Sequence, residues 1–213
     1  MERHPVPTTT AFEDPESFWN EKLSGEEYHF GRLPNVFLQH AAKGFHASST
    51  ILCVADGEGR NSTWLAQQGH QVTAFDISSV GLSKARRLSE ACGVQVDYQR
   101  SSIEEWHWEA ARYDVVAAIF IQFATPITRR WLWGQIHQTL KPGGLLVLQG
   151  YTPAQLALRT GGPSNPEHLY TKVLLEDELS AFSRLDCSEY EQVLQEGPGH
   201  NGPSALVRAV AVK

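Results

Sequence analysis

From residue 50 onward, hydrophobic positions alternate between strand-like runs and helical spacing. Apolar runs predict strands at 50–55, 71–75, 94–99, 114–121 and 144–149, and the segments between them predict helices at about 61–68, 79–91 and 126–140. This alternation is typical of stacked βαβ units around a mainly parallel sheet. The run 114–121 is apolar almost throughout, which indicates a central strand with helices covering both faces of the sheet.

The segments on either side of this core have different patterns. Before it, Glu13 to Leu23 and Asn35 to Phe45 carry apolar residues at helical intervals, and Asn35 is available as an N-cap. After residue 150, a Gly/Pro-rich stretch leads to a helix at about 173–182. Two strand-like runs follow, 184–194 and 204–212, joined by EGPGHNGP. They predict an antiparallel hairpin at the edge of the sheet.

Length and composition predict a single domain. The 213 residues are 41% hydrophobic and 20% charged, which fits one α/β domain with appendages. Residues 1–14 contain two prolines, three consecutive threonines and no periodicity, so we expect a flexible N-terminal arm. Residues 15–213 would then form the domain.

Charge, cysteines and histidines narrow the class of partner. A formal net charge of −6 gives no basic field for nucleic acid, so a small-molecule partner is favoured. The basic and aromatic stretch 129–133 could suggest a surface for single strands, but Trp133 shares a helical face with Leu132 and Ile136, which indicates packing. The three cysteines have no CxxC spacing, and the histidines have no close helical pair, so we expect no metal site.

No segment resembles a membrane anchor. The longest apolar run, 115–121, is far shorter than the roughly 20 residues of a membrane span, and MERHPVPTTT has no apolar signal-peptide stretch. We therefore expect a protein without membrane association, located in the cytoplasm.

The segment ADGEGRN at 55–61 is the first motif with a chemical meaning. It lies where a predicted strand ends and a helix begins, and Gly57 and Gly59 would let the backbone approach a ligand closely. Asp76 ends the second strand 17 residues after Gly59, where the topology brings a carboxylate beside the glycine loop, able to bind both hydroxyls of a ribose. Together they indicate an adenosine-containing cofactor. The alternatives are an ordinary tight turn and an N-cap for the helix beginning near Ser78.

Over most of its length the sequence resembles class I S-adenosylmethionine-dependent methyltransferases, in particular a bacterial branch close to tellurite-resistance methyltransferases. The resemblance rests on ILCVADGEGRNSTWLAQQGHQVTAFDIS at 51–78, on LKPGGLLVLQGY at 140–151, on the leading FWNEKLSGEEYHFGRLPN and on the trailing EGPGHNG. It implies an α/β fold with a single doubly wound, Rossmann-like domain. The sheet would have seven strands, mostly parallel, with the C-terminal antiparallel hairpin, and the cofactor would be S-adenosyl-L-methionine.

The glycine motif departs from the usual family pattern. The resemblance aligns Cys53 with an acidic residue and Ala55 with the first glycine. Cys53 cannot replace a carboxylate, so we interpret it as a core residue and Asp56 as a substitute. After the third strand, Ser102 stands where the family often has an acid that contacts the adenine amine, and a serine can still accept a hydrogen bond. Ile103 would offer its N–H and an apolar wall to the adenine.

The resemblance also assigns roles outside the glycine motif. It places the N-terminal helices, residues 15–46, over the cofactor as a lid, with Tyr28 beside it and Arg32 paired with its carboxylate. Trp19 and Phe30 could face the sulfonium or fill the core. The cofactor-binding set is therefore Ala55, Asp56, Gly57, Gly59, Asp76, Ile77, Ser102, Ile103, Phe120, Gln122, Tyr28 and Arg32.

Candidates for the acceptor side lie at the carboxyl edge of the later strands. Gln122 ends the fourth strand and either contacts ligand or satisfies loop backbone groups. Tyr151 leaves the fifth strand at the same edge. The turn 161–163, with His168 and Tyr170, would form a far wall, and His200 is either a surface turn residue or an acceptor contact. Gln122, Tyr151 and His200 are thus the candidate catalytic residues.

The function implied is transfer of a methyl group from S-adenosylmethionine to a small acceptor by in-line displacement. The acceptor would be a soft oxyanion such as tellurite or selenite, or a thiol compound, neither of which needs a general base once ionised. Two alternatives stay open. One is a cofactor-binding protein without catalysis, and the other is a nicotinamide-dependent oxidoreductase, although AxGxGxN is not a full GxGxxG. The sequence leaves the oligomeric state open.

Overall fold

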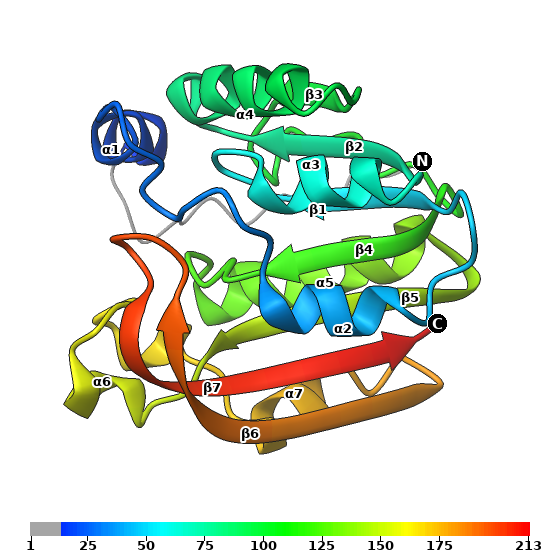
Figure 1. Cartoon of the computed structure of the whole chain (residues 1–213). Coiled ribbons are helices and arrows are strands. Elements are labelled where there is room, and N and C mark those ends of the chain that lie inside the picture. Colours follow the sequence, from blue (N-terminus) through cyan, green and yellow to red (C-terminus); the bar gives the residue numbers. More distant parts are fainter. Residues whose placement is uncertain (1–13) are drawn as a thin grey trace.

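A computed structural model describes residues 14–213, so the predicted arm at 1–14 lies outside the described residues except for Asp14. Seven strands form one sheet in the order β3-β2-β1-β4-β5-β7-β6 (Figure 1). They are β1 (Thr50–Val54), β2 (Gln71–Asp76), β3 (Asp97–Arg100), β4 (Tyr113–Ile119), β5 (Leu140–Tyr151), β6 (Arg184–Gln195) and β7 (Asn201–Val212). β1 to β5 are parallel, and β7 pairs antiparallel with both β5 and β6. The predicted fold class is confirmed.

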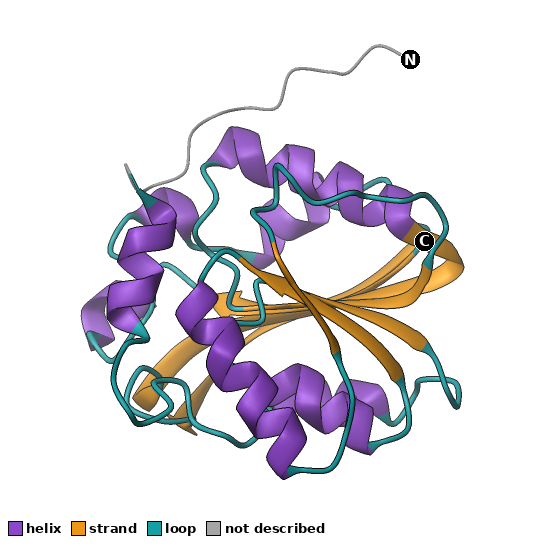
Figure 2. Ribbon diagram, turned by 90° about the horizontal axis from the view of Figure 1, so that it is seen from above, coloured by secondary structure: helices purple, strands orange, loops and turns teal. Residues whose placement is uncertain are grey.

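Helices cover both faces of the sheet (Figure 2). They are α1 (Pro15–Lys22), α2 (Val36–Ala42), α3 (Arg60–Gln67), α4 (Ser79–Ala91), α5 (Pro126–Thr139), α6 (Gln155–Leu158) and α7 (Lys172–Glu178), with a 3-10 turn, η1, at Pro166–His168. Side chains of α2, α3 and α4 pack on one face around Ile51 and Val115. Those of α5 and α7 pack on the other face around Leu52 and Val116. Neighbouring residues of one strand thus serve two cores, because successive side chains alternate between faces.

Local signals in the sequence account for most helix starts. The side chain of Asn35 caps α2 by accepting from the Leu38 N–H at 3.0 Å, as predicted. Ser78 caps α4 by accepting from Gly81 at 2.9 Å, and α5 begins with Thr125 as cap and Pro126 in its first turn. Asp14, which the sequence analysis assigned to the arm, is the N-cap of α1.

The boundaries of several elements differ from the prediction. β3 begins at Asp97 rather than at residue 94, and α7 ends at Glu178 rather than at 182. β5 includes the LKPGG segment: Tyr113 pairs with Leu140, and the next pair is Val115 with Leu145, so the intervening residues bulge out of the ladder. A turn-like composition does not exclude pairing by the residues on either side of the turn.

The central position of β4 is confirmed. It lies between β1 and β5, and its interior residues are buried on both faces. Within the stretch at 129–133, Arg129, Leu132 and Trp133 are part of the packed interior, and Arg130 is exposed. Trp133 is buried, and the Arg129 guanidinium donates to the Glu178 carboxylate with both Nε (2.8 Å) and Nη2 (2.7 Å) while Trp133 donates to it at 2.9 Å. This ion pair joins α5 to α7.

Candidate active site

A cavity of about 690 Å³ opens at the carboxyl edge of the parallel strands, where ligands bind in open α/β sheets. Its walls come from α1, from the loops after β1, β2, β3 and β4, from the segment after β5 and from the β6–β7 loop. Of the predicted site residues, it is lined by Ala55, Asp56, Gly57, Asp76, Ile77, Ser102, Ile103, Phe120, Gln122, Tyr151 and His200.

The glycine loop after β1 is held in a left-handed backbone conformation. Ala55, Gly57 and Gly59 have φ values of +48°, +62° and +85°. A Cβ on Gly59 would lie 2.5 Å from that of Ala85, so only glycine lets α3 and α4 approach this closely. A Cβ on Gly57 would meet no protein atom within 4 Å, so this backbone is open to a ligand. Ala55 therefore occupies a position that favours glycine, as the alignment with the family's first glycine implied.

Asp76, at the end of β2, is tied to this loop. Its carboxylate accepts from the N–H of Gly57 and from the N–H of Ser78, each at 2.8 Å. Burial raises the pKa of the carboxyl group, although both hydrogen bonds favour its charged form. The cap of α4 is Ser78, so the alternative that Asp76 serves as its N-cap is wrong. Each carboxylate oxygen still has a lone pair for a ligand hydroxyl.

Asp56 and Cys53 form the floor of the cavity beneath the loop. The hydroxyl of Ser62 donates to the Asp56 carboxylate. Burial raises the pKa of Asp56 to about 7, and the nearby charge of Asp76 adds to this shift. Cys53 is 2% exposed and packs in the core, and burial raises the pKa of its thiol well above the usual range. Asp56 is thus the carboxyl group available at the position where Cys53 replaces the family's acid.

The loops after β2 and β3 supply a flatter, more apolar wall. Ile77 and Ile103 line it, and Ser102 accepts from the Glu105 N–H at 3.2 Å. Phe75, which also lines the cavity, stacks on Trp106 behind it with ring centres 4.4 Å apart. The wall can hold a planar ring against apolar side chains with a hydroxyl at its edge.

Only part of the predicted lid covers the cavity. From α1, the side chains of Phe18, Trp19 and Lys22 line it, and Phe30 follows from the next segment. The Asn20 carboxamide accepts from the Ser78 hydroxyl at 2.8 Å, which fixes α1 to the start of α4. In contrast, α2 packs on the face of the sheet and contributes nothing to the lining.

The structure contradicts the placement of Tyr28 and Arg32 at the cofactor. The Tyr28 hydroxyl donates to the Lys84 carbonyl at 3.0 Å, and the Arg32 guanidinium lies 4.6 Å from the centre of the Tyr28 ring. Both residues line a small surface hollow over α4 instead of the cavity. The reason is that both partners of a buried ion pair, Lys84 and Glu58, bind the backbone of this segment. The Lys84 ammonium donates to the Glu27 carbonyl at 2.7 Å, and the Glu58 carboxylate accepts from the Phe30 N–H at 3.1 Å.

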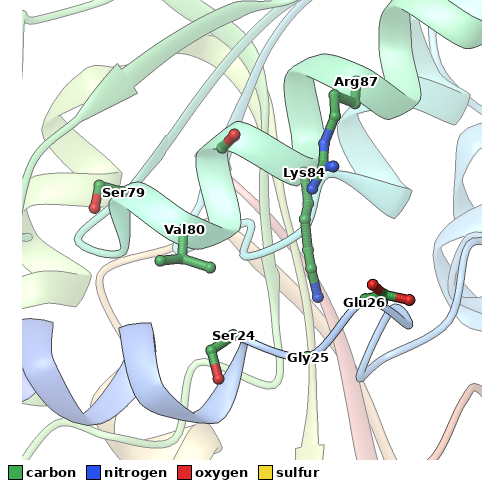
Figure 3. Close-up of a pocket in the computed structure, with 8 residues that line it drawn as sticks. Ser24, Gly25, Glu26, Ser79, Val80, Lys84 and Arg87 are labelled. Atoms are coloured by element: carbon green, nitrogen blue, oxygen red, sulfur yellow. The ribbon is translucent and has the colours of Figure 1, made fainter.

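A second surface hollow lies beside this contact, between the end of α1 and α4 (Figure 3). Ser24, Gly25 and Glu26 face Ser79 and Val80 across it, and Lys84 reaches down between the two elements. The Lys84 ammonium donates to the Glu27 carbonyl at 2.7 Å. The contacts around this hollow therefore hold α1 and the residues after it against α4.

His200 is buried in the wall of the cavity and is not a surface turn residue. Its ring is 7% exposed and lies 4.6 Å from Phe30, 4.3 Å from Phe120 and 5.8 Å from Tyr151, measured between ring centres. Its Nδ1 is 3.8 Å from the Glu196 carboxylate, beyond hydrogen-bonding distance. Burial lowers the pKa of His200 to about 4, so the ring is neutral at pH 7.

The other two candidate catalytic residues are placed differently. Gln122 accepts from the Tyr151 N–H at 2.6 Å and donates to the carbonyls of Tyr151 and His168 at 2.9 Å each. Its amide is therefore occupied by loop backbone, which was the alternative for this residue. Tyr151 is 1% exposed, and its ring supports Gly161 and Gly162. His168 lines the cavity as expected, but Tyr170 belongs to the core.

Phe120 has a strained backbone at the centre of this wall. Its φ is +57°, an uncommon value for an aromatic residue. The N–H of Phe120 donates to the Gln149 carbonyl at 2.8 Å, which holds the turn after β4 in place. The conformation brings the Phe120 ring against Tyr151, with ring centres 4.9 Å apart. Strain at this residue therefore shapes the cavity wall.

A buried polar network lies behind His200 and was not predicted from the sequence. Arg60, which lines the cavity, donates to Glu196 at 2.7 Å, and the Asn35 amide donates to the same carboxylate at 3.1 Å. Burial alone would raise the pKa of the Glu196 carboxyl group, but His200 and Arg60 favour its charged form, so the pKa is lowered to about 2. The three residues Asn35, Arg60 and Glu196 are 25 to 161 positions apart in sequence. No local pattern could reveal their contact.

The β6–β7 loop is fitted to the N-terminal segment through glycines. The N–H of Gly199 donates to the His29 carbonyl at 2.8 Å. A Cβ on Gly197 would lie 2.3 Å from the Gly31 nitrogen, so the two backbones meet with no room for side chains. The EGPGHNG segment thus places His200 beside Phe30.

Among residues 14–213, no group of three or more His, Cys, Asp or Glu side chains could hold a metal ion.

Comparison with known proteins agrees with this geometry. A methyltransferase domain family matches residues 51–144, the stretch that holds the glycine loop, Asp76 and Ser102. This stretch belongs to a methyltransferase domain family, and the chain as a whole is similar to class I S-adenosylmethionine-dependent methyltransferases. It is 33% identical over 162 residues to a ubiquinone biosynthesis O-methyltransferase of Xanthomonas axonopodis pv. citri. The match covers 69% of this chain and 65% of that relative, so the chain spans just under two thirds of the relative's length.

Solved structures show the same fold as this chain. One is a protein of echinomycin biosynthesis, described for the conversion of a disulfide bond into a thioacetal group. It has a TM-score of 0.72 at 16% identity over 92% of this chain and 89% of that one. TehB from Haemophilus influenzae has a TM-score of 0.67 at 15% identity over 93% and 66%. A methyltransferase from Methanosarcina mazei has a TM-score of 0.65 at 20% identity over 85% of this chain and 99% of that one.

In the part of this chain that the structure describes, no helix is both long and apolar enough to span a membrane.

Proposed function

We propose that this chain transfers a methyl group from S-adenosylmethionine to a small-molecule acceptor. The observation that carries the proposal is the convergence of the open glycine loop and the buried Asp76 carboxylate on one cavity. Family membership and the antiparallel end of the sheet support a methyl donor over a nicotinamide cofactor.

The residues of the cavity fit S-adenosylmethionine. A Cβ on Gly57 would enter empty space, and a cavity of about 690 Å³ is in the size range of small-molecule sites. Asp76 would hold the ribose hydroxyls, the wall of Ile77, Ser102 and Ile103 would hold the adenine, and Asp56 would face the methionine end. When bound, this cofactor supplies an electrophilic methyl group on a positively charged sulfur.

The chain's own contribution to the reaction is positioning and exclusion of water. Phe30, Phe120, Tyr151 and His200 form a collar of uncharged rings at the acceptor end. Aromatic faces stabilise a nearby cation without forming an ion pair with it. The collar also keeps water from the reacting atoms, and fixed geometry converts a bimolecular displacement into a more favourable unimolecular one.

As the methyl acceptor we propose a thiol compound or a soft oxyanion such as tellurite or selenite. A hydroxyl acceptor is a second candidate, favoured by His200. Because that ring is neutral at pH 7, its unprotonated nitrogen can accept a hydrogen bond from a hydroxyl group in the collar and so orient it. The relative from Xanthomonas, named an O-methyltransferase, supports this second candidate.

The test is methyl transfer from radiolabelled S-adenosylmethionine to separate acceptors: selenite, tellurite, a small thiol and a phenol. We expect product from one class at a rate well above that without protein. His200→Gln should lower turnover of the phenol at least tenfold and leave that of an ionised thiol within threefold, if each is a substrate. Binding of the cofactor with no product from any acceptor would favour a binding protein without catalysis.

A further inference from the structure

Lys22, the last residue of α1, places an ammonium group at the rim of the cavity. Its Nζ lies 5.1 Å from the centre of the Trp19 ring, 5.6 Å from Phe18 and 6.0 Å from Phe30. The side chain lines the same cavity as Asp76 and Phe120. Within residues 14–213 the ammonium makes no hydrogen bond or ion pair with another residue.

The other cationic side chain of the lining is already neutralised. Arg60 donates to Glu196 at 2.7 Å, and both side chains are 6% exposed. Lys84, just behind the glycine loop, is paired with Glu58 at 2.7 Å. Among the described residues that line the cavity, Lys22 is therefore the lysine or arginine whose charge is not balanced by a carboxylate.

The surroundings of Lys22 favour a counter-ion from a ligand. Burial of its stem against the aromatic side chains lowers the pKa of the ammonium, since ring faces replace part of its water. The rings also hold the group by cation–π contact, so little further ordering is needed for it to meet an anion. Phe30 contacts both Lys22 and His200, so the ammonium lies beside the aromatic collar.

We infer that the Lys22 ammonium binds an anionic group, a carboxylate or an oxyanion, of the molecule that occupies this cavity. The inference rests on the proposed function for its two sources, the carboxylate of the methyl donor and a negatively charged acceptor. It replaces Arg32, which lies outside the cavity, as the cation for such a group.

The test compares Lys22→Met and Lys22→Arg with the unchanged protein and with Lys43→Met, which removes an exposed lysine at the end of α2. The probes are S-adenosylmethionine, its decarboxylated form and selenite, the last with S-adenosylhomocysteine present. Calorimetry gives each dissociation constant, and thermal unfolding verifies that every variant is folded.

A charge-assisted hydrogen bond of ordinary strength predicts a loss of tenfold or more in Lys22→Met. If the cofactor carboxylate is the partner, the loss affects S-adenosylmethionine and spares the decarboxylated form. If the acceptor is the partner, the loss affects selenite alone. In both cases Lys22→Arg stays within about threefold of the unchanged protein, and Lys43→Met within twofold.

Equal affinities of Lys22→Met and the unchanged protein for all three probes would overturn the inference alone. If the unchanged protein fails to bind S-adenosylmethionine, the proposed function fails instead. In that case selenite binding that depends on Lys22 would still support the inference, and its absence would overturn both.

Discussion

The backbone N–H of Gly57 donates to the carboxylate of Asp76 over 2.8 Å, which ties the loop after β1 to the end of β2. The same carboxylate is the group we expect to bind the ribose. We predict that Asp76→Ala weakens binding of S-adenosylmethionine by about 1–3 kcal/mol, since polar partners are left unsatisfied. Calorimetry measures the change in affinity. The control is Asp97→Ala, which changes an exposed residue at the start of β3, the end away from the cavity. Unchanged affinity would mean that Asp76 only supports the loop.

Ala55 has a φ of +48° where glycine is unstrained. The left-handed conformation costs a residue with a Cβ about 1–2 kcal/mol, and glycine loses about 0.4–1 kcal/mol through the entropy of the unfolded chain. Ala55→Gly should therefore raise the free energy of unfolding by about 0.5–1 kcal/mol in urea titrations. Ala66→Gly, inside α3, should lower it by a similar amount. Equal destabilisation by both would show that Ala55 is not strained.

Asp56, with a pKa of about 7, is largely protonated at pH 6. A positively charged ligand beside it favours the ionised form, so binding should release a proton at this pH. The affinity for S-adenosylmethionine should therefore rise as the pH increases from 5.5 to 7.5, and this rise should be smaller in Asp56→Asn. Calorimetry in buffers of different ionisation enthalpy measures the proton release. The same pH dependence in Asp56→Asn would assign the titration to another group.

His200 has a pKa of about 4 in the folded protein, against 6.5 in the unfolded chain. The unfolded state therefore binds more protons between these values, so stability rises with pH across this window. The contribution is fully present above pH 6.5 and is lost as the pH falls towards 4. Relative to His200→Gln, the unchanged protein should lose up to about 3 kcal/mol between pH 7 and pH 4. A difference between the two proteins that does not vary with pH would contradict burial of the neutral ring.

The sequence was sufficient to predict the sheet and the glycine loop because both depend on local pattern. The alternation of hydrophobic periods located five parallel strands and the closing hairpin. The alignment with the family placed Ala55 at a glycine position, and the structure shows that its backbone is left-handed. Asp76 was also predictable, since the end of β2 lies beside the loop in any fold of this topology.

The side of the cavity away from the loop could not be predicted in the same way. Tyr28 and Arg32 lie against α4 because Lys84, distant in sequence, binds their segment through its carbonyl and its ammonium. His200 is buried because Gly197 and Gly31 let two loops meet. Such contacts depend on tertiary packing, and the sequence around each residue carries no trace of them.

The central claim is that the cavity binds S-adenosylmethionine. Calorimetric titration of the purified protein with S-adenosylmethionine, S-adenosylhomocysteine and NAD, in parallel, tests it most directly. We predict saturable binding of the first two at a stoichiometry near one, and no heat from NAD beyond dilution. Binding of NAD alone would contradict the account and reassign Asp76 to the ribose of a dinucleotide.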